Sequence, residues 1–152
     1  MNEKVYSLLG VAGPLLAFVS TGVSIALSPW FSWWENALSD LGHSVESGVA
    51  PIFNLGLLTA GFLTSVYAIT VFREHSKYTS VCMVVSAFLL QLVSTFDEVY
   101  GFLHYVVSVL FFVSMGAASV AYAVERRSVL SAAAFVVGLS SWALYWMKAY
   151  SA

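Results

Sequence analysis

The fold is decided by long apolar runs, and the clearest of them reads FLHYVVSVLFFVSMGAASVAYAV, from Phe102 to Val124. It holds no Asp, Glu, Lys or Arg, and as a helix it is long enough to cross the hydrocarbon core of a bilayer. Backbone polar groups in lipid must pair within their own segment, so the run predicts a transmembrane helix. Working outward, similar runs occupy residues 8–27, 51–72, 79–95 and 129–147. We therefore predict an all-α, polytopic membrane helix bundle, a single domain over residues 1–152 with five transmembrane helices.

The composition favours the same class of protein. Of the 152 residues, 60% are hydrophobic and only 9% are charged, whereas a soluble domain carries about 25% charged residues. A chain so poor in charge cannot cover a water-facing surface. The net charge of −2 provides no basic field for nucleic acid, and the single cysteine, Cys82, excludes an intrachain disulfide.

The basic residues predict the orientation of the bundle. They gather in the segments on one side, at Lys4, Arg73, Lys77, Arg126 and Arg127, with only Lys148 on the other side. By the positive-inside rule the protein lies in the cell membrane with a cytoplasmic N-terminus and an outside C-terminus. The first run follows Lys4 as a secretory signal would, but it is long for that role and no small-residue cleavage pattern precedes Ser28. We therefore expect it to be a retained helix.

The outer segment 28–50 is long for a simple connection between two helices. Its apolar residues recur at helical spacing, which predicts an interfacial helix in the head-group layer; they are Trp30, Trp33, Trp34, Leu38 and Leu41. Ser28 and Pro29 suit the start of such a helix. Its opposite face and the positions beside it carry polar candidates for a site: Asn36, Ser39, Asp40 and His43.

The second outer connection adds further polar residues. Asp97 and Glu98 lie just before the fourth helix, where carboxylates suit its free N–H groups. His104 lies about one turn inside that helix, with Ser108 one turn deeper on the same face. Asn54 lies about one turn inside the second helix. We expect this group to meet the polar residues of the first outer segment in one site.

Two blocks of sequence resemble a prokaryotic membrane family catalogued as domain of unknown function number 998. The first block is NALSDLG at Asn36 to Gly42, followed by FNLGL at Phe53 to Leu57. The second contains Phe96, Asp97, Glu98, Gly101, His104, Phe111 and Phe112. Family members often carry a Pro after the Phe, which is absent here, and usually a sixth helix. The resemblance implies the membrane fold and these candidate residues, and a bundle of five helices is expected to carry an exposed groove or to receive a partner there.

The polar group permits a catalytic hypothesis. Its histidines and carboxylates would bind a divalent metal that activates water against a lipid head group or ester; the candidate ligands are His43, His104, Asp97 and Asp40. Ser39 or Asn36 would bind the developing oxyanion, and the candidate catalytic residues are Ser39, Asp40 and His104. The sequence holds no HExxH motif to support such a metal site. A haem between His43 and His104 would require both to face one cavity.

A structural hypothesis explains the same residues without chemistry. Asp40 would cap N–H groups of its own loop, Asp97 would cap the fourth helix, and His104 would hydrogen-bond one of these two carboxylates. Such contacts would pin the long outer segment to the bundle. The chain would then serve as a subunit beside a membrane-protein partner or in a homo-oligomer.

Lipid binding is the third hypothesis. The binding residues would be Asn36, Asp40, His43, Asn54, Asp97, Glu98 and His104, and a cationic head group would suit their acidic, Trp-rich rim. The resemblance also implies a relation to lipid-associated membrane families, which favours a lipid ligand. Ion conduction is not expected, because the midplane offers only Ser, Thr and Gln91. We favour a non-catalytic function, lipid binding or a role in a complex, with the metal-dependent hydrolase as the alternative.

Overall fold

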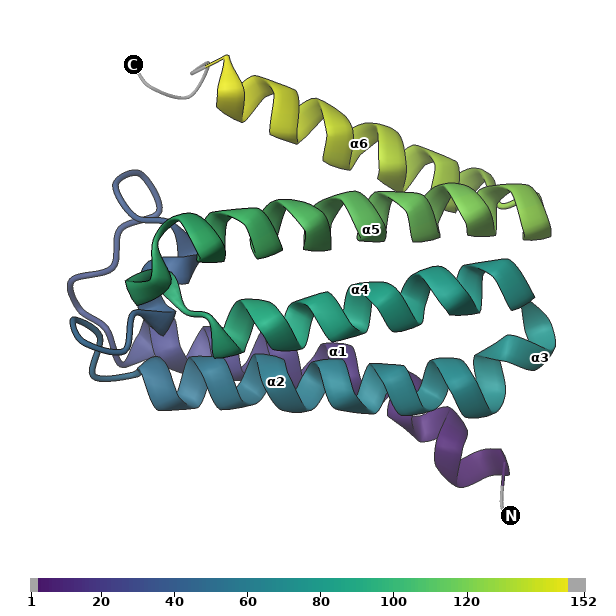
Figure 1. Cartoon of the computed structure of the whole chain (residues 1–152), viewed down its shortest axis with the longest axis horizontal. Coiled ribbons are helices and arrows are strands. Elements are labelled where there is room, and N and C mark those ends of the chain that lie inside the picture. The colour runs from purple at the N-terminus through teal and green to yellow at the C-terminus, as the bar shows by residue number, and fades with distance from the viewer. Residues whose placement is uncertain (1–2, 148–152) are drawn as a thin grey trace.

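The computed structural model describes residues 3–147. Within these residues all regular structure is helical, and there is no strand. The long helices are α1 (Glu3–Ala26), α2 (Ala50–Tyr67), α4 (Lys77–Thr95), α5 (Phe102–Arg126) and α6 (Val129–Trp146) (Figure 1). Between them lie the 3₁₀-helices η1 (Leu38–Gly42) and η3 (Glu98–Tyr100), the π-helical turn η2 (Ala68–Phe72) and the short α3 (Arg73–His75).

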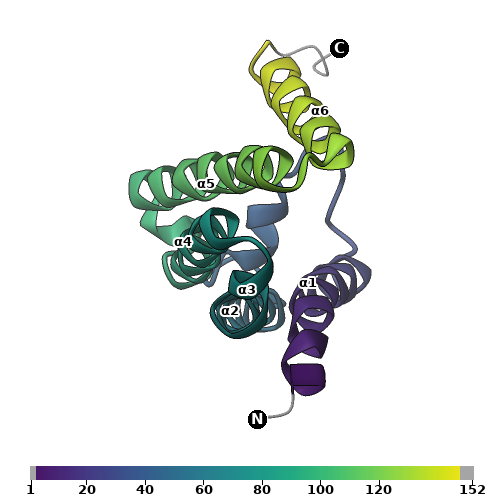
Figure 2. The same ribbon diagram turned by 90° about the vertical axis from the view of Figure 1, so that its right-hand side faces the viewer.

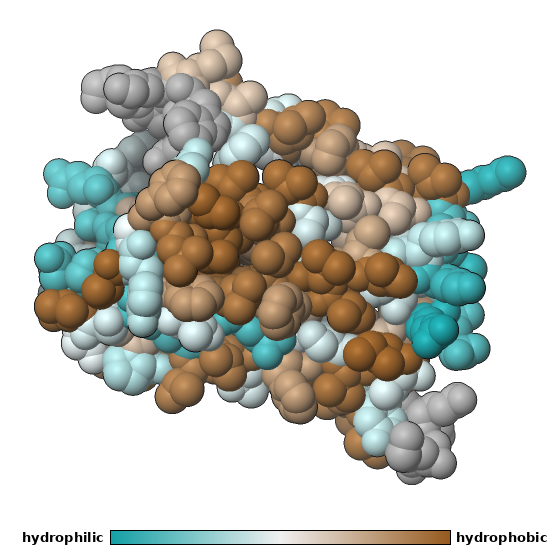
Figure 3. All heavy atoms as spheres, in the orientation of Figure 1, coloured by the Kyte–Doolittle hydropathy of each residue, from teal (hydrophilic) through white to brown (hydrophobic). Residues whose placement is uncertain are grey.

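The helices have the length and composition of membrane spans. Four stretches are long and apolar enough to cross a bilayer, namely Val5–Ala26, Ala50–His75, Lys77–Thr95 and Phe102–Arg126. The apolar part of α6 over Val129–Leu144 is shorter. Figure 3 shows apolar surface over the middle of the molecule and hydrophilic surface toward its two ends. The predicted all-α, membrane-compatible bundle is confirmed, and the fifth span stays a prediction.

The helices pack in chain order and form an open arc. Within residues 3–147, α1 packs on α2, α2 on α4, α4 on α5 and α5 on α6, whereas α1 and α5 do not pack on each other. The end-on view in Figure 2 shows this arrangement. Small residues allow the close contacts: a Cβ added to Gly61 would lie 2.7 Å from the Ala87 carbonyl oxygen. The arc therefore encloses a space that is open between α1 and α5.

The predicted interfacial helix in the first outer segment is wrong. Residues 27–49 form a series of turns, and the only helix among them is the five-residue η1. Side chains take backbone donors that a helix would use, since Asn36 Oδ1 accepts the Ser32 N–H at 3.0 Å and Asp40 Oδ2 accepts the Ala37 N–H at 3.2 Å. The helical spacing of the tryptophans is therefore overridden by local side-chain hydrogen bonds.

The first outer segment is instead anchored on the outer end of α2. Leu41, expected to face the head groups, is fully buried and packs with Val49 and Phe53. Asn54 Nδ2 donates to the Gly42 carbonyl oxygen at 2.8 Å. These contacts hold η1 against the bundle, which fixes the position of its polar residues.

At the opposite end of the bundle, Glu125 connects α5 to the start of α4. Its carboxylate accepts the backbone N–H groups of Tyr78 and Thr79 at 3.0 and 2.8 Å, and it also accepts the Thr79 hydroxyl. The first N–H groups of a helix have no partner within it, so Glu125 satisfies the start of α4 from a neighbouring helix. Ser80 Oγ donates to the Ala68 carbonyl oxygen at 2.7 Å, which ties α4 to the π-helical turn.

Candidate functional site

The loop before η1 and η1 itself position Asp40 by local hydrogen bonds. Its Oδ2 atom accepts Asn36 Nδ2 at 2.9 Å and the backbone N–H of Ala37 at 3.2 Å. Asp40 therefore caps its own loop, as the structural hypothesis expected. The neighbouring Ser39 side chain is left to point toward the second outer connection, where it finds its partner.

The second outer connection is shaped by Asp97, which is 7% exposed. Its Oδ1 atom accepts the Val99 N–H at 3.1 Å. Asp97 therefore caps η3 and not α5, the helix that it was predicted to cap. Gly101 follows with φ of +53°, a left-handed conformation that a glycine adopts without steric cost. This turn leads into α5 and presents Glu98 toward η1.

Glu98 joins the two outer connections. Ser39 Oγ donates to Glu98 Oε1 at 3.2 Å, and a side-chain hydrogen bond links Glu98 to Asp40. The two connections therefore meet, as the sequence predicted. The contact runs through Glu98, whereas Asp97 turns back onto its own backbone.

The surroundings of Glu98 raise the pKa of its carboxyl group. Burial raises the pKa of Glu98 above its ordinary value of 4.5, because loss of solvent penalises the carboxylate. The hydrogen bond and negative charge of Asp40 raise this pKa further, and the Ser39 hydrogen bond and the His104 charge oppose them. In its protonated form Glu98 can donate to Asp40 while it accepts from Ser39.

His104 lies in the first turn of α5 and is oriented by the backbone. Its Nδ1 atom lies 2.7 Å from the Phe96 carbonyl oxygen, and its Nε2 atom lies 3.4 Å from Ser108 Oγ. A carbonyl oxygen only accepts, so Nδ1 carries the proton and Nε2 faces Ser108 with its lone pair. The predicted hydrogen bond from His104 to Asp40 or Asp97 is wrong, because Phe96 takes that place.

His43 belongs to a smaller cavity on the outer side. Its Nδ1 atom accepts the Glu46 N–H at 3.2 Å. The cavity has a volume of about 610 Å³ and is lined by Trp30, Asn36, Asp40, His43, Glu46 and Glu98. Among these residues three carboxyl groups and an indole ring surround the space, which is a suitable environment for a cationic group.

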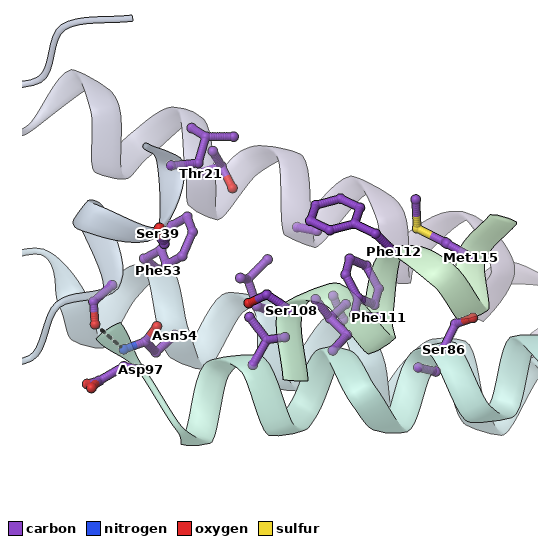
Figure 4. A pocket seen from close by; sticks show the side chains of 18 of the residues that line it. Thr21, Ser39, Phe53, Asn54, Ser86, Asp97, Ser108, Phe111, Phe112 and Met115 are labelled. Atoms are coloured by element: carbon purple, nitrogen blue, oxygen red, sulfur yellow. Dashed lines mark hydrogen bonds between the residues drawn. The ribbon is translucent and has the colours of Figure 1, made fainter. Parts of the chain in front are cut away.

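A larger cavity, the groove, lies on the open side of the helix arc. It has a volume of about 1070 Å³ and takes its walls from α1, α2, α4 and α5, including Thr21, Leu57, Ser86, Leu90, Phe111, Phe112 and Met115. Its outer end is polar and includes Ser39, Asn54, Asp97, Glu98, His104 and Ser108. Figure 4 shows Ser39, Asn54 and Asp97 at one end and Phe112 and Met115 toward the other. Glu98 lines both this groove and the smaller cavity.

The predicted metal ligands are not gathered in one place. Over residues 3–147, no group of three or more His, Cys, Asp or Glu side chains is arranged to hold a metal ion. His104 lines the groove and His43 lines the smaller cavity. The condition for a haem, that both histidines face one cavity, is therefore not met. Among the predicted binding residues, the groove brings together Asn54, Asp97, Glu98 and His104, with Ser39.

From the family resemblance we expected an exposed groove or a partner in its place, but we did not place the groove between α1 and α5. An apolar side chain on α1 or α4 that faces the groove looks the same as one that faces lipid, because both environments are apolar. The available signal was the resemblance to a family that usually has a sixth helix, and this did not identify the helices that line the groove.

The comparison with known proteins finds a family whose model matches the chain. A family model described as protein of unknown function (DUF998) matches residues 11–151. No curated protein matches the chain, and no solved structure matches it. The matched region contains every residue that lines the two cavities.

Proposed function

We propose that this chain, which belongs to the DUF998 family, binds a membrane lipid. The acyl chain lies in the groove, and an amine-bearing head group lies at the polar outer end. The observation that carries the proposal is the distribution of polarity along one continuous cavity. Charged and polar side chains gather at the end near Glu98 and His104, and the rest is lined mainly by apolar side chains, with Thr21, Thr64 and Ser86 among them. An amphiphile has the same division between head and chain.

The dimensions of the groove suit an acyl chain. It follows α5 from His104 to Ala118, a rise of about 20 Å at 1.5 Å per residue. One leaflet of a bilayer core is about 15 Å thick, half of the whole core. A lipid can enter from the bilayer without crossing water, since the groove lies between α1 and α5, which do not pack together.

The charges at the outer end favour an amine in the head group. The residues that line the smaller cavity and the polar end of the groove include Asp40, Glu46, Asp97 and Glu98, and none of them is Lys or Arg. Trp30 adds an aromatic face, which attracts an ammonium group. A phosphate or carboxylate alone would find no counter-charge here.

The placement in the membrane is part of the proposal. All five long helices cross the bilayer, with the N-terminus in the cytoplasm and the C-terminus outside. Arg73, Arg126 and Arg127 lie at the turns of one end, where the positive-inside rule expects the cytoplasm. Trp33 and Trp34 are exposed at the other end and would lie in the outer head-group layer.

The experiment is mass spectrometry of lipids that co-purify with the chain in a mild detergent. We expect an aminophospholipid to be retained in preference to an anionic lipid without an amine. The Leu90→Trp variant fills the groove and should lower the lipid retained about tenfold, a loss of about 1.4 kcal/mol. Phe88→Trp is the matched control, because Phe88 lies on the same helix, is exposed and does not line the groove.

The proposal fails if the purified chain carries no lipid, or if both tryptophan variants retain the lipid equally well. It also fails if a protein helix occupies the groove. In that case the partner would be released by Leu90→Trp, and no lipid would be found with the complex.

A further inference from the structure

His104 and Ser108 form a pair that lipid binding does not require. They lie four residues apart on one face of α5, both line the groove, and Ser108 Oγ lies 3.4 Å from His104 Nε2. A serine hydroxyl beside an imidazole nitrogen is the arrangement of a nucleophile and its general base. The pair therefore has a chemical use in addition to its place in the wall.

The tautomer of His104 is the one that a general base needs. The bond from Nδ1–H to the Phe96 carbonyl oxygen, at 2.7 Å, directs the lone pair of Nε2 toward the serine. The backbone thus takes the orienting role that a third side chain often plays in such sites.

The depth of Ser108 places it where an ester would lie. It follows the start of α5 at Phe102 by six residues, about 9 Å along the helix. It is therefore below the acidic outer end and above the apolar part of the groove. In a bound glycerolipid the ester groups occupy the same position, between the head group and the acyl chains.

We propose that Ser108 and His104 hydrolyse an acyl ester of the lipid bound in the groove, an inference that rests on the proposed lipid-binding function. Ser108 Oγ attacks the ester carbonyl carbon while its proton moves to His104 Nε2. The bond between that carbon and the alkoxy oxygen breaks, and His104 gives the proton to the departing alcohol. Water then attacks the acyl–Ser108 ester through His104, which releases the fatty acid and restores the serine.

Other serines near the site are less suited to this role. Ser39 Oγ donates to Glu98 Oε1 at 3.2 Å, so its hydrogen bond goes to a carboxyl group and not to a histidine nitrogen. Ser114 on the same helix donates to the Phe111 carbonyl oxygen at 2.8 Å. Of these three serines, only Ser108 lies beside a histidine nitrogen, and this makes Ser114→Ala a matched control.

The test uses the full chain in lipid nanodiscs with a fluorophosphonate probe, which phosphonylates activated serines. We expect one phosphonyl adduct, located on Ser108 by peptide mass spectrometry, and release of fatty acid from an aminophospholipid. Ser108→Ala should remove the adduct and the hydrolysis while the bound lipid is retained. Ser114→Ala should change neither, and His104→Gln should lower the rate about 10²–10⁴-fold, the usual contribution of a general base.

The outcomes separate this inference from the proposed function. Bound lipid without any adduct or released fatty acid would overturn the esterase and leave lipid binding standing. An adduct that persists in Ser108→Ala would also overturn it, because another serine would then be the nucleophile. Absence of bound lipid would overturn the proposed function itself.

Discussion

At the scale of single residues, Glu98 determines how the two outer connections hold together. It accepts Ser39 Oγ, shares a hydrogen bond with Asp40 and lines both cavities. The contact is strongest when Glu98 is protonated, because two ionised carboxyl groups at this distance repel each other. The protonation of Glu98 therefore affects the contact between η1 and the start of α5.

This gives a pH dependence whose sign is fixed by the raised pKa. The folded chain binds a proton at Glu98 more tightly than the unfolded chain, so its contribution to stability is complete below the ordinary pKa of 4.5. The contribution is lost as pH rises from 4.5 through the raised pKa in the folded state. We expect the Tm in detergent to fall over this window in the native chain and to fall less in Glu98→Gln. Thermal unfolding followed by intrinsic fluorescence at a series of pH values measures the difference.

Glu35→Gln supplies the control for that measurement. Glu35 is an exposed acid of the same outer segment and lines neither cavity. Its variant should keep the pH profile of the native chain. Parallel profiles for Glu98→Gln and the native chain would contradict the assigned role of Glu98.

The same scale shows what a sequence reveals about a site. The types and spacing of Asp40, Glu98 and His104 were enough to place them at one end of the bundle. The capping role of Asp40 was predicted, but the backbone partners of Asp97 and His104, at Val99 and Phe96, were not. Backbone acceptors are present at every residue, so no sequence pattern marks the ones that will be used.

At the scale of the helices, close contact between α2 and α4 depends on Gly61. A Cβ at this position would lie 2.7 Å from the Ala87 carbonyl oxygen, a backbone atom that cannot move by itself. Gly61→Ala should therefore push the two helices apart and cost about 1–3 kcal/mol, the usual range for overpacking. Reversible unfolding in mixed micelles would measure this loss.

Gly22→Ala in α1 is the comparison for that variant. No heavy atom lies within 4 Å of the position that its Cβ would take. Alanine is a better helix former than glycine by about 1 kcal/mol, so this change should be neutral or stabilising. Equal destabilisation by both substitutions would show that lost contact between α2 and α4 is not the cause.

The helices also show where prediction from sequence succeeded and where it failed. The long helices were predictable, because lipid permits few alternatives to a helix for an apolar run. The outer segment was not, because in water and head groups Asn36 and Asp40 compete for backbone N–H groups. The spacing of Trp30, Trp33 and Trp34 therefore predicted a helix. The Asn36 and Asp40 side chains prevent this helix.

At the scale of the whole molecule, the open arc of helices has charged residues at both of its ends. The polar outer end joins the groove at Glu98, while Glu125 ties α4 to α5 at the other end. In the proposed orientation, the polar end of the groove lies in the outer leaflet and the arginine-bearing turns lie in the cytoplasm. The orientation therefore decides from which leaflet the lipid would come.

Cysteine labelling tests this orientation in cells. In a Cys82→Ala background, Glu46→Cys and Arg127→Cys each place one thiol at an exposed position, at opposite ends of the bundle. A membrane-impermeant maleimide should label Glu46→Cys in intact cells and Arg127→Cys only after the cells are opened. The reverse pattern would place the acidic site in the cytoplasm, and labelling of both in intact cells would mean that α5 does not separate the two faces of a membrane.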